Sequence, residues 1–247
     1  ALEKARTRMP EAFSTLPEAD VEIRPYPAYR ASATGEYRPS SEDGTRPGIF
    51  YISVLEPENR TRANQQSFLY HETLPGHHLQ SAIALELGDR VHPLARYLYN
   101  SGYGEGWGLY AEFLAGEMGL LNGPLERIGL LNELGTRAAR LVVDTGLHTK
   151  GWTREQALDT LHEISLWPDY ELESEVNRYS SWPGQAVSYM LGMREILRLR
   201  ALAKQRLGDD FDIREFHARV LENGEVTLPM LEEAVLAWIA ESASRSR

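Results

Sequence analysis

Apolar residues recur at helical spacing through almost all of the chain beyond residue 60, and this periodicity restricts the fold more than any other feature of the sequence. A period of 3.6 residues places apolar side chains on one face of each helix, and those faces must pack together in a core. The polar residues 242–247 at the end are expected to be disordered. Helices are predicted over residues 62–87, 104–120, 125–148, 153–166, 183–207, 212–224 and 228–242, after the tail of a helix over residues 3–14.

The segment from about residue 20 to residue 54 has a different pattern. Three short stretches rich in β-branched and aromatic residues, 21–27, 31–37 and 48–54, are bounded by proline and glycine and predict strands. No internal repeat or low-complexity linker divides the chain. We therefore expect a single domain over residues 1–247, mainly α with a small antiparallel β-sheet, which is an α+β fold.

Charge and composition exclude several classes of protein. The net charge of -10 argues against nucleic acid as a partner, because phosphate contacts need clustered Lys and Arg. No apolar run approaches the ~20 residues of a membrane helix, and no signal peptide opens the sequence. Because the first residue is Ala1 and not Met, the sequence does not predict the compartment of the protein. No sequence pattern predicts its oligomeric state either. The sequence has no cysteine, so a metal ion would have to be bound by His, Asp and Glu.

Three of the seven histidines lie within eight residues, in the stretch HETLPGHHLQ over residues 71–80. The H-E-x-x-H motif of zinc peptidases has two histidines four apart, with a glutamate as general base. Here Pro75 occupies the position of the second histidine, and His77 and His78 follow it. A lone histidine is usually a core or surface residue, but a cluster beside an acid favours a metal site.

The Pro75–Gly76 pair would make this long spacing workable. On an ideal helix His78 would face the same side as His71 but lie about 10 Å along the axis, too far for two nitrogens each ~2.0–2.1 Å from one zinc ion. Proline disrupts the helix and glycine permits a bend, so a local bulge would bring either His77 or His78 back to the metal. Glu72 is placed to act as the base for a metal-activated water.

A catalytic zinc site usually has three protein ligands, and the third is expected within the stretch SGYGEGWGLYAE, residues 101–112. Glu105 and Glu112 are seven residues apart and share one helix face, whereas Glu117 does not. Glycines at alternate positions weaken a helix and suit a backbone packed closely on another element, such as the histidine helix. A surface acid on an ordinary helix is the plainer interpretation, and the spacing does not match a phosphate-binding loop.

Five stretches of the chain resemble a known bacterial family, the one catalogued as domain of unknown function 885. They are RPGIFYISV, HETLPGHHLQ, EGWGLYAE, VDTGLHTKGWTREQA and RYSSWPGQAVSYMLG, in the order found in the family, from about residue 20 to residue 200. Members are usually longer, so the resemblance implies that this chain is the C-terminal part that carries the site. The family is similar to the gluzincin metallopeptidases, which implies a zincin-like domain with two histidines of one helix and a glutamate of the next as zinc ligands.

The resemblance also implies particular roles for residues. Thimet-type oligopeptidases and dipeptidyl peptidase III carry a Gly-His pair at the end of shorter versions of the motif, which favours His77 over His78. By the same analogy Glu105 is the third ligand of Zn²⁺ and Glu112 orients a ligand. Tyr189 is expected to stabilise the oxyanion, with Tyr179 or Arg178 as substitutes.

Two further groups are interpreted through the resemblance. Arg140, Asp144 and His148 are four residues apart on one helix face, where they would orient the metal ligands or form a simple ladder of ion pairs. The stretch over residues 46–54 would be an edge strand along which an extended peptide could lie, or an ordinary half-buried strand.

The function expected from these residues is that of a zinc-dependent metallohydrolase acting on a peptide or small amide. His71, His77 and Glu105 would bind zinc, Glu72 would be the base, and Tyr189 would stabilise the oxyanion. Two alternatives remain: a catalytically degenerate peptide- or metal-binding protein, and a metal-dependent amidase or esterase acting on a non-peptide substrate. The substrate and the mode of cleavage are not encoded in any pattern that we identify.

Overall fold

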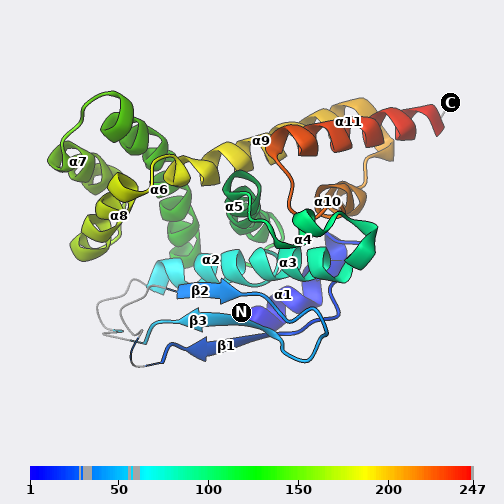
Figure 1. Ribbon diagram of the computed structural model, residues 1–247, viewed down its shortest axis with the longest axis horizontal. Coiled ribbons are helices and arrows are strands. Elements are labelled where there is room, and N and C mark those ends of the chain that lie inside the picture. Colours follow the sequence, from blue (N-terminus) through cyan, green and yellow to red (C-terminus); the bar gives the residue numbers. More distant parts are fainter. Residues whose placement is uncertain (28, 30–34, 55–56, 58–61, 246–247) are drawn as a thin grey trace.

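Most of the chain is helical, and a small three-stranded sheet lies along one side of the helices (Figure 1). The structure is a computed structural model that describes residues 1–27, 29, 35–54, 57 and 62–245. None of the helices within this part of the chain is both long and apolar enough to cross a membrane.

The sheet is mixed, so the prediction of an antiparallel sheet is wrong for one of its two pairings. β3 (Gly48–Ile52) lies in the middle, antiparallel to β2 (Gly35–Arg38) and parallel to β1 (Val21–Pro25). Alternation of side chains predicts that a segment is a strand, but it carries no information on strand order or direction. The edge strand nearest the helices is β2, and the stretch over residues 46–54 contains the central strand instead. Residues 31–34 of the second predicted strand lie outside the described residues.

The helical pattern over residues 62–87 forms two helices, α2 (Arg62–Glu72) and α3 (His77–Glu86), which lie one after the other above the sheet (Figure 1). The chain turns between them at Thr73–Gly76, with a cis peptide bond before Pro75. A Cβ atom on residue 76 would lie 1.9 Å from the carbonyl oxygen of His71, so only glycine fits there. The indole N–H of Trp107 donates to the carbonyl of Pro75 at 3.0 Å and fixes the turn from the opposite side.

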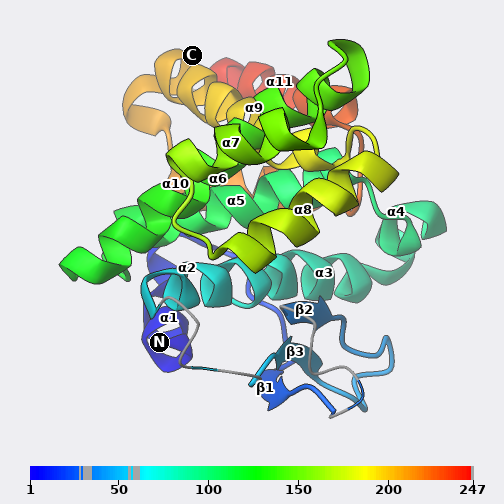
Figure 2. The same cartoon turned by 90° about the vertical axis from the view of Figure 1, so that its left-hand side faces the viewer.

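Further helices stack above α2 and α3 in layers, with α5 (Ser101–Glu117) and α6 (Pro124–Thr149) next and α9 (Gln185–Leu207) beyond them (Figure 2). The α5 and α9 backbones touch, because a Cβ atom on Gly106 would lie 2.5 Å from the Cα of Gly192. Glycine is therefore required at this crossing. The main core lies around it and contains Tyr103, Trp107, Leu109, Tyr110, Met193, Ile196, Leu199 and Phe216.

The other elements complete the helical part and differ from the sequence prediction in a few places. The chain ends in α11 (Leu228–Arg245), so residues 242–245 are helical and not disordered; residues 246–247 lie outside the described part. Two helices were not predicted, α4 (Pro93–Tyr97) and α8 (Asp169–Ser181). The remaining elements are α1 (Leu2–Arg8), α7 (Arg154–Ile164), α10 (Ile213–Leu221) and the 3-10 turns Met9–Glu11, Gly88–Arg90 and Gly208–Asp210.

Candidate metal centre

Three side chains meet where α2, α3 and α5 come together. His71 is near the end of α2, His77 begins α3, and Glu105 lies in the second turn of α5. Nε2 of His71 and Nε2 of His77 lie 3.4 Å and 3.5 Å from the same atom, Oε2 of Glu105. The two imidazole rings are nearly perpendicular, with centroids 4.7 Å apart, and one donor atom of each residue lies within 4.8 Å of the others. The structure thus brings together the three residues that the sequence predicts as ligands.

The orientation of the His71 ring is set by the fully buried Glu112 of α5. Nδ1 of His71 lies 2.8 Å from Oε1 of Glu112, whose other carboxylate oxygen accepts a hydrogen bond from the hydroxyl of Ser67. In the neutral ring that a metal ligand requires, a carboxylate bonded to Nδ1 favours the tautomer that leaves Nε2 free. The ring lies flat against α5 because residue 108 is glycine; a Cβ atom there would lie 2.6 Å from the imidazole.

His78 lies apart from this cluster, although it is the neighbour of His77 in the sequence. Its Nδ1 is 3.0 Å from the hydroxyl of Tyr37 on β2, and its Nε2 is 3.0 Å from the carbonyl oxygen of Ala19. Burial lowers the pKa of His78 to about 4, so the ring is neutral, with Nε2 as the donor and Nδ1 as the acceptor. Of the two histidines that the spacing left open, only His77 faces His71 and Glu105.

The acids and bases of the cluster shift one another's pKa. Burial alone would lower the pKa of His71, but its hydrogen bonds to Glu105 and Glu112 raise it to about 9. Burial would raise the pKa of Glu105, yet the two histidines hold it well below its ordinary value. The carboxylate of Glu105 is therefore ionised in the neutral pH range, as a metal ligand must be.

Glu72, the predicted base, lies beside the cluster and is 7% exposed. Burial raises its pKa, an effect that is opposed by His77, by His71 and by the nearby backbone of Tyr37 on the edge strand β2. A carboxylate with a raised pKa is a better proton acceptor than an ordinary surface glutamate. Its place between the cluster and β2 suits a group that acts on a molecule lying along this strand.

Tyr189, the predicted oxyanion donor, stands on α9 beside His71, and the centroids of the two rings are 6.1 Å apart. Burial raises the pKa of its hydroxyl, and the charge of Glu105 adds to the effect. The group is therefore protonated in the neutral range and able to donate a hydrogen bond.

A cavity of about 670 Å³ contains these groups. It is lined by residues of β2, α2, α3, α5, α6, α8 and α9, and the side chains of His71, Glu72, His77, Glu105 and Tyr189 all reach it. The volume falls within the ~300–1,000 Å³ range of sites for small molecules. A second cavity, on another part of the described chain, has a volume of about 180 Å³.

Comparison with protein families places the chain in a bacterial group. Residues 1–235 match the family described as "Bacterial protein of unknown function (DUF885)". The chain belongs to this family. The comparison with curated proteins found none that matches the sequence.

Two solved structures of similar fold are longer proteins. A crystal structure described as a "putative lipoprotein" from Colwellia psychrerythraea is 39% identical, with a TM-score of 0.94 over 97% of this chain and 41% of its own length. A "putative lipoprotein of unknown function" from Shewanella oneidensis is 23% identical, with a TM-score of 0.75 over 95% of this chain and 45% of its own, and supports the fold alone. This chain from the DUF885 family thus spans less than half of either protein.

Some of the residues predicted to serve the site lie elsewhere. Asp144 accepts a hydrogen bond from the backbone N–H of Gly184 at 3.1 Å, and His148 is bonded to the carbonyl of Tyr179 at 2.9 Å. Both therefore tie α6 to the α8–α9 region, and neither orients a histidine of the cluster. Tyr179 is buried in a second core, where its hydroxyl accepts from Nε of Arg140, so it is not placed to donate into the cavity. Arg140 and Arg178 do line the cavity.

Other residues of the site were missed by the sequence analysis. Tyr99 lines the cavity, and desolvation of its hydroxyl and the charge of Glu105 raise the pKa of that group, although 56% of the residue is exposed. Burial also raises the pKa of Glu225 to about 7, and its carboxylate accepts from the backbone N–H of Asn100 at 3.3 Å. Neither residue lies in a recognised motif. Each belongs to a loop, and only the folded structure shows that this loop reaches the cavity. Trp167 and Arg137 also line the cavity. In the sequence only the size of the one and the charge of the other set them apart, and neither property predicts a place in the site.

Proposed function

We propose that this protein is a zinc-dependent hydrolase and that its substrates are peptides. The observation that carries the proposal is the spacing of the three donor atoms. Distances of 3.4 Å and 3.5 Å from the histidine nitrogens to Glu105 Oε2 are longer than a good N–H···O hydrogen bond of ~2.7–3.2 Å. Atoms bound to one tetrahedral zinc ion at ~2.0–2.2 Å would be about 3.4 Å apart.

The chemistry of the donors supports zinc among the divalent ions. Two imidazoles and one carboxylate form a common ligand set of catalytic zinc, which leaves a further position for water or substrate. The carboxylate of Glu112 on Nδ1 of His71 is the usual support of such a ligand. The arrangement resembles that of the gluzincin metallopeptidases, in which two histidines and a glutamate come from two neighbouring helices.

The residues around the cluster supply the remaining parts of a hydrolytic site. A zinc ion bound there would polarise a water molecule and the carbonyl group of the bond to be cleaved. Glu72 would accept the proton of the attacking water, and the protonated hydroxyl of Tyr189 would donate to the oxygen on which negative charge develops. The edge strand β2, which lines the cavity, would support an extended peptide by strand addition.

The proposal is tested with Glu72→Gln in protein loaded with one equivalent of zinc. We expect wild type to hydrolyse members of a mixed peptide pool, followed by mass spectrometry, and the variant to lose activity by ~10²–10⁴-fold. Zinc content measured by plasma emission should be unchanged, and Glu163→Gln on the exposed face of α7 should behave as wild type.

Three results would contradict parts of this proposal. Retained turnover in Glu72→Gln would remove the assignment of the base. Cleavage of esters or non-peptide amides without cleavage of any peptide would show that the substrates are not peptides. Binding of peptides without hydrolysis in any form would make the protein a binding protein with a degenerate site.

A further inference from the structure

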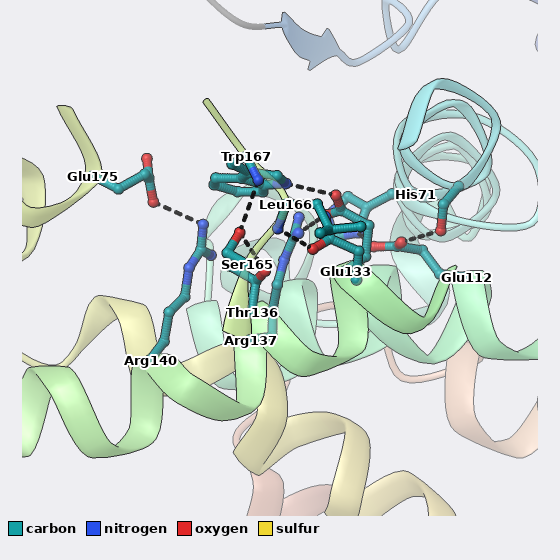
Figure 3. A network of polar contacts seen from close by, with 12 residues as sticks. His71, Glu112, Glu133, Thr136, Arg137, Arg140, Ser165, Leu166, Trp167 and Glu175 are labelled. Carbon is teal, nitrogen blue, oxygen red and sulfur yellow. Dashed lines mark hydrogen bonds and ion pairs between the residues drawn. The ribbon is translucent and has the colours of Figure 1, made fainter. Parts of the chain in front are cut away.

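An unusual concentration of arginine lies in the wall of the cavity opposite β2. Arg137 and Arg140 extend from the same face of α6, and Arg178 comes from α8 (Figure 3 shows the two on α6). We call these three residues the arginine wall. Arg137 and Arg140 are 4% and 2% exposed, and so deeply buried a cation normally has a specific partner.

Two aromatic rings hold the buried guanidinium groups in place. The Cζ of Arg137 lies 5.2 Å from the ring centre of Trp167 and 5.7 Å from that of Tyr189, and the values for Arg140 are 5.4 Å and 4.8 Å. Cations above aromatic faces are stabilised without being neutralised. The rings therefore do not cancel the charge of the two guanidinium groups.

The carboxylates that form ion pairs with the arginine wall are fewer than its guanidinium groups. Arg137 pairs with Glu133, while Arg140 and Arg178 share the single carboxylate of Glu175. Within this network three guanidinium groups face two carboxylates. Glu171 also lines the cavity and keeps its charge, but among the described residues it forms no ion pair with an arginine of the wall.

Part of the hydrogen-bonding capacity of the wall is also unused. Among the described residues no partner is found for Nε of Arg137 or for Nη1 of Arg140, although both atoms are buried. A buried N–H group of an arginine without an acceptor is costly. An anion bound against the wall would balance the excess positive charge of these ion pairs.

We infer that the arginine wall is a subsite for a carboxylate group of the peptide substrate. A carboxylate is the group that planar guanidinium forks bind with paired hydrogen bonds. This inference rests on the proposed function for the bond that is cleaved, but it concerns a different part of the substrate. The carboxylate is either the C-terminus of the peptide or the side chain of an acidic residue.

The distance from the cluster limits where this carboxylate lies in the substrate. The Cζ of Arg140 is 4.8 Å from the centre of the Tyr189 ring, which is 6.1 Å from the centre of the His71 ring, so at most about 11 Å separates guanidinium and imidazole. An extended chain advances ~3.3–3.6 Å per residue. The recognised carboxylate therefore belongs within about three residues of the bond that is cleaved.

The test compares ligands that differ only in this group. The probes are an N-acetylated pentapeptide of alanines with a free C-terminus, the same peptide as its amide, and amidated peptides with one glutamate or one glutamine at each position. Their dissociation constants are measured by calorimetry on zinc-loaded Glu72→Gln protein, so that binding does not depend on turnover. We expect the free acid or one glutamate peptide to bind about 10- to 100-fold more tightly than its neutral counterpart.

Substitutions of single arginines test whether the arginine wall causes the preference for the carboxylate. Arg178→Gln changes the most exposed of the three arginines, whose side chain is 29% exposed, and should reduce the acid-to-neutral ratio by about tenfold. Arg198→Gln is the matched control, an arginine likewise bonded to glutamates, on α9 and outside the cavity. Arg140 also ties α6 to α8, so a loss of stability alone would not report on binding.

The outcomes separate this inference from the proposed function. Preference for the carboxylate without hydrolysis by wild type supports the subsite and overturns the hydrolase. Hydrolysis with equal binding of acid and neutral peptides overturns the subsite and leaves the hydrolase. Binding of none of the peptides overturns the subsite, and so does a preference that survives Arg178→Gln. Tight binding of the free acid alone identifies the C-terminus, and tight binding of a glutamate peptide identifies a side chain.

Discussion

Two adjacent histidines, His77 and His78, have opposite environments, and hydrogen bonding at single atoms accounts for the difference. Both ring nitrogens of His78 are engaged, by the Tyr37 hydroxyl and the Ala19 carbonyl. The Nε2 of His77 instead faces Glu105 at 3.5 Å. Sequence spacing left either residue possible, because it cannot tell how a turn at Pro75 and Gly76 is closed.

Metal binding by the two histidines is therefore expected to differ. His77→Ala should lose the bound zinc, since one of three ligands is removed, whereas His78→Ala should keep about one zinc per chain. Zinc content is measured by plasma emission on protein prepared without a histidine tag. Loss of zinc in His78→Ala alone would contradict the assignment, and zinc in neither variant nor wild type after reconstitution would contradict the metal centre itself.

Glu112 is predicted to act on the metal only through His71. Glu112→Gln removes the charge bonded to Nδ1 of His71, and the zinc affinity should fall by ~10–100-fold, as for other groups that support a ligand histidine. The dissociation constant is measured by competition with a chromogenic chelator. Glu117→Gln, at the end of the same helix and paired with Arg200, is the control and should have no effect. An unchanged dissociation constant in Glu112→Gln would show that the contact is only structural.

At the level of elements, periodicity predicted most helices and failed where the pattern is short or indirect. α5, α6 and α9 are long and rich in apolar residues and were expected. α8 was missed because its segment is largely polar, with only Leu172, Val176 and Tyr179 buried. The parallel pairing of β1 and β3 was missed because strand direction depends on how the connection runs, which no local pattern records.

The alternate glycines of α5 were expected to pack on the histidine helix, but they face several neighbours. Gly108 faces the ring of His71, Gly104 faces the ring of Tyr99, and Gly106 lies against α9. A glycine in the sequence indicates that another part of the chain packs closely against it, but the sequence does not identify that part. The site could thus be assembled from its motifs, whereas the contact between the helices that carry Glu105 and Tyr189 required the structure.

Because α5 and α9 cross at such close range, one added methyl group at the crossing should lower the stability of the protein strongly. In Gly192→Ala the new Cβ atom would lie 1.8 Å from the carbonyl oxygen of Gly102, so the helices must separate, and the free energy of unfolding should fall by about 1–3 kcal/mol. Gly135→Ala on α6 is the matched control, because its nearest neighbour, Cγ2 of Ile164, would be 3.4 Å away. That change should stabilise the helix by ~0.5–1 kcal/mol. Urea unfolding measures both, and equal effects would refute the close contact.

On the scale of the whole molecule, the helical core that supports the site contains a buried titratable group far from the cluster in sequence. His217 of α10 is completely buried, with Nδ1 2.8 Å from the carbonyl oxygen of Ala12 and Nε2 2.7 Å from the hydroxyl of Tyr110. Its ring stacks on Phe13. The N-terminal segment, α5 and α10 are thus joined through one neutral imidazole.

This imidazole should make the stability of the protein depend on pH. Burial lowers the pKa of His217 to about 3 in the folded protein, against about 6.5 in the unfolded chain. Its contribution is therefore complete above pH 6.5 and is lost as the pH falls toward 3, because only the unfolded state takes up the proton. At pH 5 the loss is about 2 kcal/mol.

His217→Gln isolates this contribution. The amide can bond to the same carbonyl and hydroxyl but does not titrate, so the variant should be less stable than wild type at pH 7 through lost ring packing. Its deficit in the free energy of urea unfolding should shrink by about 2 kcal/mol at pH 5. Other titrating groups, including His71 with its raised pKa and His78 with its lowered pKa, are present in both proteins and cancel in the comparison. A deficit that is the same at both pH values would mean that His217 has the same pKa in the folded and unfolded states, which would contradict a buried neutral ring.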